Sequence, residues 1–532
     1  MFDLLIKNVT LIDGTGTSDT PVVDIGIEDG CIIAIDTSIQ GEARQVIDAQ
    51  GLVAAPGFID IHSHGDVAVL EPLETEIKLR QGVTLEVLGN CGSSVAPFDK
   101  SSRDSVLRNL FSNIGLRERG VTWTSVGQYA DQLKRNGLSI NVMSLVGHAT
   151  LRVAAMGMSA KAANVSQMGR MKQLLAQAID DGACGLSTGL IYAPGCYANT
   201  EEVLELADVL HQKGGFYASH MRNEAGLILD AMDEVIRIGQ AADIPVHISH
   251  LKVAGPTNRS LVDSVISRIE TARQNGLDIT CDVYPYFCSS TTLLALLPPW
   301  SLEGGAASLL QRLEDTSMRA RIIDEIKNGL PGWENMYHNA GWDKITIAAI
   351  QGSERKHMQG RTLDFLARDE GCDPFEWILD LIIAEKGCKI TIIAESMNEA
   401  DVIRFLSLPF AMIGSDGLPG DGRPHPRLYG TFPRVIRRFV NELGVLTLAE
   451  AIHKMTGMTA RRLGLTDRGR LAVGCRADVI LLDPGNVVDN ATFDEPRQYP
   501  SGIGTVIVDG EVIIHGGEHT GKTPGRFIKY QS

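Results

Sequence analysis

Two kinds of hydrophobic pattern divide this chain. Near both ends, short segments alternate apolar and polar residues with a period of two, which is typical of half-buried β-strands. These segments are Asp3–Val9, Val22–Glu28, Cys31–Ile35, Asp478–Leu482, Thr505–Val508 and Glu511–His515. Asp-Gly dipeptides at 29–30 and 509–510 are hairpin-turn signals between neighbouring segments. We therefore predict one small β-sandwich domain that is built from both termini, residues 1–55 and 466–532.

The middle of the chain alternates short apolar runs with helical patterns. Eight such runs recur, five of which end in Gly or Ser: Gly57–His62, Leu85–Gly89, Val142–Val146, Gly185–Ser187, Phe216–Ser219, Val246–Ser249, Ile279–Val283 and Met412–Ser415. Helical periodicity between them covers Gln167–Asp180, Glu201–Lys213, Leu227–Ala241 and Leu261–Gln274. Eight such units favour an α/β fold, a TIM-like (β/α)8 barrel over residues 56–465. The alternative is an open doubly wound sheet, which is less favoured because no glycine-rich phosphate loop occurs.

One stretch of the predicted barrel does not fit a single strand–helix unit. Residues 287–344 contain Pro298-Pro299-Trp300 and helical charge patterns of their own. We predict that this segment is an insertion near the barrel mouth and a candidate lid, because long irregular segments in compact domains often serve that role.

Composition and charge restrict the possible partners and the compartment. The 532 residues are 44% hydrophobic and 21% charged, which is enough apolar material for a large core. The net charge of −16 argues against nucleic acid and against an anionic membrane surface. Nine cysteines are few and odd in number, which suits a reducing cytoplasm better than a disulfide framework. We expect a cytoplasmic protein that acts on a small molecule.

Histidines come at the ends of the predicted barrel strands, where a barrel places its active site. His62 and His64 are two residues apart on an extended segment, so both imidazoles point to the same side and can chelate one metal ion. His220 and His250 each follow a serine at the end of a predicted strand. The alternative is that these are unrelated loop or packing histidines, but the shared position favours a metal site.

Three further residues follow predicted strands. Cys91 lies in a glycine-flanked segment from which it could reach a metal as a thiolate, although a lone cysteine is most often a core thiol. Asp416 follows the last strand and faces the histidines, which favours a catalytic carboxylate over a helix N-cap. His148 follows the third strand and could contact a substrate or order a loop.

Ordered motifs along nearly the whole chain resemble a known family. Gly57–His64 and Gly469–Asp478 resemble the amidohydrolase superfamily. More closely, the chain resembles the N-acyl-D-amino-acid deacylases, or D-aminoacylases. The segments that carry this resemblance are Asn90–Ser94, Val146–Thr150, Gly185–Tyr192, His220–Glu224, His250–Lys252, Tyr284–Tyr286, Gly414–Pro419 and Pro424–Arg427.

The resemblance implies a zinc site and a proton carrier. A tightly held Zn²⁺ would be bound by Cys91, His220 and His250. A second, weak or vestigial metal position would use His62, His64 and Asp416, and Asp416 would also be the catalytic base and acid. Residues 185–190 contain no lysine, which speaks against the carboxylated-lysine subtype and against dihydroorotase or hydantoinase chemistry.

The resemblance also implies an anchor for the α-carboxylate of the substrate, consisting of Lys252, Tyr192, Tyr284, Ser289 and Ser290. A cation and hydroxyl donors that converge on an anion suit that task. Arg222, Glu224 and Arg427 are expected to support the site, with Arg222 and Glu224 pairing to each other.

The predicted function is hydrolysis of N-acyl-D-amino acids, and the D preference comes from the resemblance alone. Residues 289–297 hold hydroxyls and aliphatic side chains without Arg or Lys, which favours neutral or apolar substrate side chains. One alternative is a dipeptidase that cleaves before a C-terminal D-residue. The other is a non-catalytic amidohydrolase-like scaffold, which would be expected to have lost metal ligands.

Overall fold

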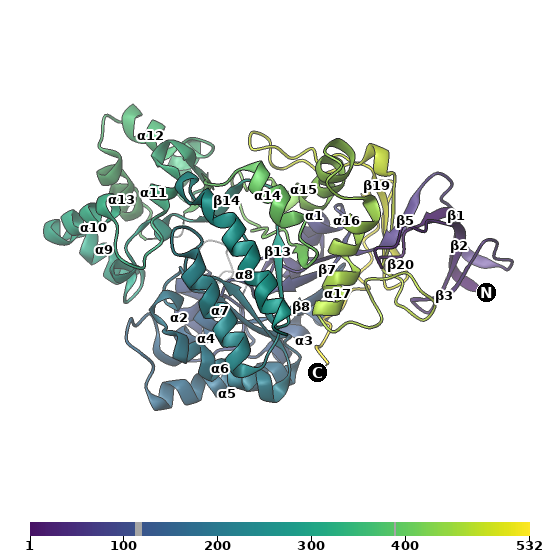
Figure 1. Cartoon of the computed structure of the whole chain (residues 1–532), viewed down its shortest axis with the longest axis horizontal. Coiled ribbons are helices and arrows are strands. Elements are labelled where there is room, and N and C mark those ends of the chain that lie inside the picture. Colours follow the sequence, from purple (N-terminus) through teal and green to yellow (C-terminus); the bar gives the residue numbers. More distant parts are fainter. Residues whose placement is uncertain (112–119, 388–389, 532) are drawn as a thin grey trace.

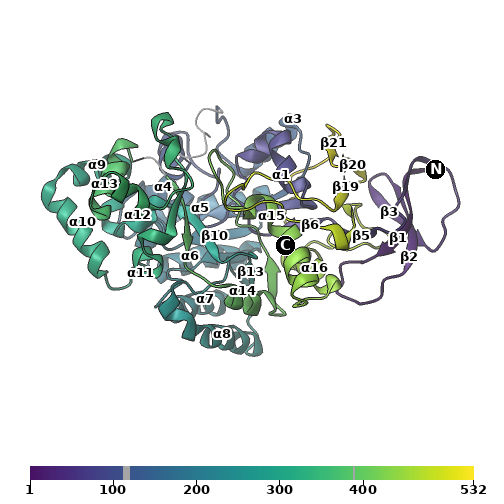
Figure 2. The same ribbon diagram turned by 90° about the horizontal axis from the view of Figure 1, so that it is seen from above.

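The molecule consists of a central barrel, an insertion at one end of the molecule and a β-sheet of terminal strands at the other. The computed structural model describes residues 1–111, 120–387 and 390–531 (Figure 1). Helices α9 to α13 gather at one end of the molecule and strands β1 to β3 lie at the other, with the barrel between them (Figures 1 and 2). Among the described residues, no helix is both long enough and apolar enough to cross a membrane.

The terminal strands form one nine-stranded sheet. Its order is β21-β20-β19-β18-β5-β1-β2-β3, and β4 also pairs with β1. The strands are β1 (Phe2–Leu11), β2 (Val22–Glu28), β3 (Cys31–Asp36), β4 (Ala43–Asp48), β5 (Val53–Pro56), β18 (Val479–Leu482), β19 (Ile503–Val508), β20 (Glu511–His515) and β21 (Glu518–His519). All six predicted terminal strands are present. Because β5 pairs antiparallel with β18, the two ends of the chain share this sheet.

The last residues of the chain leave that sheet and return to the barrel. The backbone N–H groups of Gly525 and Ile528 donate to the carbonyls of Leu138 and Val142, and Tyr530 N–H donates to Gly182 O. The predicted β-domain range ends at residue 532, but this tail packs against the barrel instead.

Eight parallel strand positions close the barrel. They are β6 (Phe58–Asp60), β7 (Val83–Leu88), β8 (Asn141–Ser144) continued by β9 (Val146–Gly147), β10 (Gly185–Gly189), β11 (Phe216–His220), β12 (Val246–Ile248), β13 (Ile279–Val283) and β17 (Ala411–Ile413). Neighbours pair in this order, and a parallel bridge from Ser63 to Gly417 joins the first position to the last. The sheet is therefore closed, which confirms the (β/α)8 barrel and excludes the open doubly wound sheet.

Helices cover the outside of the barrel. They are α1 (Glu76–Leu79), α2 (Arg103–Leu110), α3 (Val126–Asn136), α4 (His148–Met156), α5 (Val165–Asp181), α6 (Thr200–Lys213), α7 (Ile228–Ala242), α8 (Val262–Gln274), α14 (Glu399–Leu406), α15 (Arg427–Arg434), α16 (Leu448–Met455) and α17 (Gly457–Arg462). The four predicted helices correspond to α5 through α8. Two of them have an asparagine N-cap: the side chains of Asn164 in α5 and Asn199 in α6 each accept a hydrogen bond from a backbone N–H of the first turn.

The insertion between β13 and α14 is a folded unit. Its strands β14 (Cys288–Thr292), β15 (Ile345–Ala349) and β16 (Thr391–Glu395) form an antiparallel sheet in the order β14-β16-β15. Its helices are α9 (Ala306–Glu314), α10 (Thr316–Asn328), α11 (Met336–Ala340), α12 (Leu363–Asp369) and α13 (Pro374–Ala384). Leu293, Ile345 and Ile392 belong to a core of its own. The unit therefore continues to β16, well past the predicted boundary at residue 344.

Candidate metal and catalytic site

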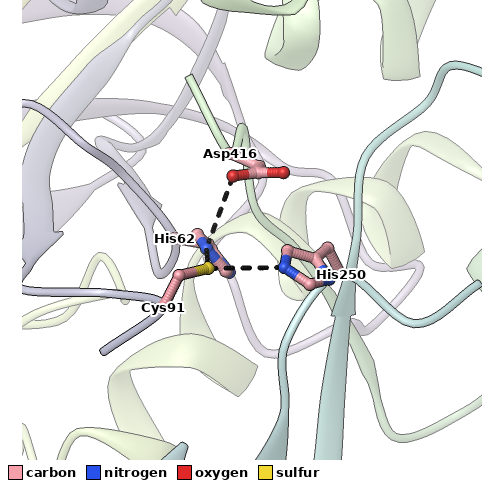
Figure 3. A group of neighbouring side chains, drawn as sticks. All are labelled: His62, Cys91, His250 and Asp416. Atoms are coloured by element: carbon pink, nitrogen blue, oxygen red, sulfur yellow. Dashed lines mark hydrogen bonds and ion pairs between the residues drawn. The ribbon is translucent and has the colours of Figure 1, made fainter. Parts of the chain in front are cut away.

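The barrel strands bring the predicted ligand residues together. Ligand atoms of His62, Cys91, His250 and Asp416 lie within 4.8 Å of one another (Figure 3). His250 also belongs to a second group with His220 and Glu224, by the same distance limit. Each of these residues comes at or just after the carboxyl end of a strand, so the closure of the barrel places them in one cluster.

Three residues of the cluster have a left-handed backbone. Cys91, His250 and Asp416 have φ values of 50°, 38° and 47°. Such values are unfavourable for residues other than glycine and persist only where the surrounding structure imposes them. Here they produce a sharp turn after the strand, which directs each side chain into the cluster.

The Cys91 side chain suits a metal ligand. Its Sγ lies 3.3 Å from His62 Nε2 and 3.4 Å from His250 Nε2. Burial raises the pKa of the Cys91 thiol, but His62 and His250 outweigh burial and hold that pKa well below its ordinary value. The thiolate, which is the form that binds metals, is therefore favoured.

His220 has properties that suit a zinc ligand. Burial lowers the pKa of His220, which favours the neutral imidazole. Both of its ring nitrogens are buried; neither makes a hydrogen bond with a described residue, and Nε2 lies 3.4 Å from Glu224 Oε2. Buried nitrogens without a hydrogen bond are costly unless a ligand satisfies them. Cys91 and His220 belong to different groups, which share His250; a thiolate with two imidazoles would be a three-ligand zinc set that leaves one position open.

Asp416 is an ionised carboxylate next to this donor set. Its Oδ1 lies 3.1 Å from His64 Nε2 and 3.5 Å from His62 Nε2, and its Oδ2 lies 2.8 Å from Arg427 Nη1. Burial raises the pKa of Asp416, but Arg427 and the histidines outweigh burial and hold it well below its ordinary value. The next helix, α15, begins at Arg427, so Asp416 is not a helix cap.

Two buried residues behind His62 escaped the sequence analysis. Asp282 Oδ2 lies 3.1 Å from His62 Nδ1 and 3.0 Å from His247 Nε2. This contact orients the His62 ring so that its Nε2 faces the cluster. Two features of the sequence could have revealed these residues: Asp282 is a charged residue inside the apolar strand β13, and His247 lies inside β12.

Lys252 and Glu224 are linked to the donor set. Lys252 is buried, and its Nζ lies 2.7 Å from both Glu224 Oε1 and His250 Nδ1. Burial raises the pKa of Glu224, but Lys252 and the two histidines lower it more, to about 2. Arg222 pairs with Glu234 at 2.8 Å instead of with Glu224, so the expected Arg222–Glu224 pair is wrong.

A cavity of about 220 Å³ opens beside the cluster. Every predicted metal, catalytic and substrate-binding residue except His62 lines it: His64, Cys91, His220, His250, Asp416, Lys252, Tyr192, Tyr284, Ser289 and Ser290. Side chains of the insertion, such as Leu297, Leu302 and Glu334, form part of the same wall. The insertion therefore covers the mouth of the barrel.

The hydroxyls in the cavity differ in their partners. Tyr192 hydroxyl lies 2.8 Å from Thr291 Oγ1, and Ser289 Oγ donates to Ala394 O at 3.4 Å. The buried Tyr284 hydroxyl has no hydrogen-bond partner among the described residues. His148 is not among the described residues that line the cavity; its Nε2 lies 2.8 Å from Glu202 Oε1.

A buried ionic network fastens the Asp416 loop to the first strand. Lys78 Nζ donates to Asp60 Oδ2 and to Ser415 Oγ, the latter at 2.6 Å, and lies 3.6 Å from Glu86. Asp60 Oδ1 accepts the backbone N–H groups of Ser415 at 2.8 Å and of His62 at 3.2 Å. The loops that carry the first and last residues of the cluster are therefore held by shared partners.

Replacement of Lys78 by methionine is expected to destabilise the barrel. Asp60 and Glu86 would stay buried without their cation, a change that costs about 3–5 kcal/mol. The thermal midpoint measured by scanning calorimetry should fall by about 5 °C. Lys134→Met on the exposed face of α3 is the control and should change the midpoint by less than about 1 °C. Equal midpoints for the two variants would contradict the role of the network.

Comparison with known proteins shows the family to which this chain belongs. The sequence profile of the amidohydrolase family matches residues 45–284 and 310–514, and the chain belongs to that family. It is 36% identical over 527 residues to a D-aminoacylase of Alcaligenes xylosoxydans xylosoxydans, covering 99% of this chain and 97% of that one. It is 34% identical to an N-acyl-D-aspartate deacylase of the same organism, covering 99% and 95%. The crystal structure of N-acyl-D-glutamate deacylase from Bordetella bronchiseptica, in complex with zinc and a phosphonate inhibitor, aligns with a TM-score of 0.84 at 33% identity, covering 99% of each chain.

Proposed function

We propose that this protein is a zinc-dependent N-acyl-D-amino-acid deacylase. The observation that carries the proposal is the clustering of candidate metal ligands at the cavity that also contains Lys252. Two groups share His250: one adds His62, Cys91 and Asp416, and the other adds His220 and Glu224. The similarity to a D-aminoacylase and to deacylases of N-acyl-D-aspartate and N-acyl-D-glutamate supports it over the full length of the chain. A scaffold that had lost its function would have no need to retain this donor set.

The metal site has a tight and a weak part in this proposal. Cys91, His220 and His250 would hold one zinc ion, because a thiolate and two imidazoles are preferred zinc ligands. His62, His64 and Asp416 would form the second, weak or vestigial position. When bound, zinc polarises the scissile carbonyl and acidifies the attacking water.

Asp416 moves the proton in the reaction. As a carboxylate it accepts a proton from the attacking water, whose oxygen bonds to the acyl carbon. It then donates this proton to the amide nitrogen as the C–N bond breaks, which yields a carboxylate and a free D-amino acid. The contact with Arg427 keeps Asp416 ionised at the start of the cycle.

The α-carboxylate of the substrate would be held by Lys252, Tyr192, Tyr284, Ser289 and Ser290. The unpartnered Tyr284 hydroxyl supports this assignment, because it is a buried donor that lines the cavity. Lys252 contributes positive charge that Glu224 partly balances in the absence of substrate.

A substrate screen with zinc-loaded enzyme tests the proposal. We expect release of D-amino acids from N-acetyl-D-amino acids and no release from the L series. Dipeptides with a C-terminal D-residue form a separate arm, and faster cleavage of these would identify a dipeptidase instead. An enzyme with full zinc that cleaves neither class would overturn the assignment.

Neutral substrate side chains should be preferred over acidic ones. Residues 289–297 of the insertion contribute hydroxyl and aliphatic groups to the cavity, and the buried cations Lys252 and Arg427 each face an acidic partner. We expect a higher kcat/KM for N-acetyl-D-methionine or N-acetyl-D-leucine than for N-acetyl-D-glutamate. A preference for the glutamate derivative of more than about tenfold, or roughly 1.4 kcal/mol, would make this prediction wrong.

Arg108 is the residue to replace if kcat/KM is higher for the glutamate derivative than for the neutral substrates. It lines the cavity at an exposed position and makes no ion pair with a described residue. Loss of the glutamate preference in Arg108→Met would then identify this arginine as the cation that binds the second carboxylate.

We propose a cytoplasmic location and a small-molecule substrate as the principal partner. The free state of all eight cysteines within the described residues supports a reducing compartment. The net charge of −16 supports the absence of a nucleic-acid partner.

A further inference from the structure

The two halves of an N-acyl-amino acid extend in different directions from the amide bond that is cleaved. The proposed carboxylate anchors Lys252 and Tyr284 follow β12 and β13, and Tyr192 follows β10. In the closed strand order, β7 and β8, which β9 continues, lie across the barrel from β12 and β13. With the amino-acid half over β12 and β13, the acyl chain extends from the cluster toward the segments that follow β7 and β9.

Apolar side chains make up part of the cavity wall above those segments. We call them the acyl wall and define it as Phe111, Ala149 and Met158, with Leu302 from the insertion; all four line the cavity. Met158 and Leu302 are only half-buried, so part of their apolar surface faces the open cavity. Solvent-facing apolar surface inside a cavity is typical of a site that binds an apolar group.

The insertion closes the outer side of this wall. Gly304 N–H donates to Met158 O at 3.0 Å. Gly305 has a φ of 80°, and a Cβ at this position would lie 2.5 Å from Asn109 Oδ1 and 3.4 Å from Met158 Cγ. The backbone of the insertion is thus seated closely on α2 and on the loop after α4, which places Leu302 beside the acyl wall.

The charge on this side of the cavity lies at its rim. Apart from Cys91 of the cluster, Arg108 is the one charged side chain that the described segments after β7 and β9 add to the cavity. Arg108 is exposed, so it marks the solvent end of the wall. Two further acidic residues line the cavity from other segments, Asp66 after β6 and Glu334 from the insertion.

We infer that the preferred substrates carry a medium-length alkyl acyl group, such as octanoyl, which the acyl wall buries. This inference rests on the proposed function and adds the acyl class to it. An acetyl group would leave most of the acyl wall uncovered. Each methylene that moves from water onto an apolar surface contributes about a fourfold gain in binding when fully buried.

The test compares N-acetyl-, N-butanoyl-, N-hexanoyl- and N-octanoyl-D-methionine with zinc-loaded enzyme, below the concentration at which the longest forms micelles. We expect kcat/KM to rise along the series and to be about tenfold or more higher for octanoyl than for acetyl. A flat or falling series with clear cleavage of the acetyl substrate would overturn the inference and leave the proposed function intact. No cleavage of any member would overturn the proposed function itself.

A pair of variants tests whether the dependence of kcat/KM on acyl-chain length comes from the acyl wall. Met158→Glu places a carboxylate on the acyl wall and should reduce the octanoyl-to-acetyl ratio of kcat/KM at least fivefold. Met318→Glu makes the same substitution on the outer face of α10, where the side chain is 39% exposed, and should leave the ratio unchanged. An unchanged ratio in Met158→Glu would show that the alkyl chain does not lie on this wall.

Discussion

Replacing Cys91 with alanine is expected to abolish tight zinc binding and, with it, the hydrolysis of N-acyl-D-amino acids. Cys91 supplies the thiolate of a three-ligand set, and its Sγ lies 3.4 Å from the Nε2 of His250. A three-ligand zinc site rarely keeps its affinity after the loss of one ligand. His220→Ala should have the same effect. Zinc per chain is measured by elemental analysis after gel filtration in metal-free buffer.

The control for this experiment is Cys196→Ala. Cys196 is also a half-buried free thiol, and it lies outside the described cavity wall. This variant should keep about one zinc per chain and normal turnover. If Cys91→Ala or His220→Ala behaves like the control in both measurements, that residue does not belong to the metal site.

Asp416→Asn is expected to keep its zinc and to lose most of its activity. The amide is nearly isosteric with the carboxylate but cannot accept the proton of the attacking water. Groups that act as general acid and base contribute about 10²–10⁴-fold to the rate. We therefore expect kcat to fall by about that factor, with zinc content equal to that of the unmodified enzyme. Steady-state kinetics and elemental analysis of the same preparation give both numbers.

Asp421→Asn is the matched control in the same loop. Asp421 is exposed and is not part of the described cavity wall, so its replacement should leave kcat within about twofold. A near-normal kcat in Asp416→Asn would mean that Asp416 does not carry the proton. Loss of zinc in Asp416→Asn would instead identify this carboxylate as a ligand of the tight site.

Much of the cluster was predictable because its signals are local. His62 and His64 are two residues apart just after a strand, and both contact Asp416, although only His62 belongs to the four-residue cluster. A glycine-flanked cysteine and an aspartate directly after a strand carry the same kind of local information. Once eight strand–helix units are counted, the geometry of a closed barrel places all strand ends at one mouth.

The extent of the insertion was not predictable from periodicity. Strand β14 pairs with β16, whose residues follow it by about a hundred positions, and β15 completes that sheet. The apolar pattern of β15 and β16 resembles that of a barrel strand. Only the antiparallel pairing and the separate core around Leu293 and Ile392 assign these strands to the insertion.

The sequence by itself determined the barrel and the terminal strands and predicted candidate metal ligands, because each depends on patterns within a few residues. The tertiary structure decided which partners these residues have. Asp282 orients His62, Arg427 pairs with Asp416, and the C-terminal tail returns to the barrel. Each of these contacts joins positions far apart in the chain, and no local pattern encodes which distant residue will arrive there. Because the pKa of a buried side chain depends on those neighbours, the ionised state of Asp416 became visible only in the fold.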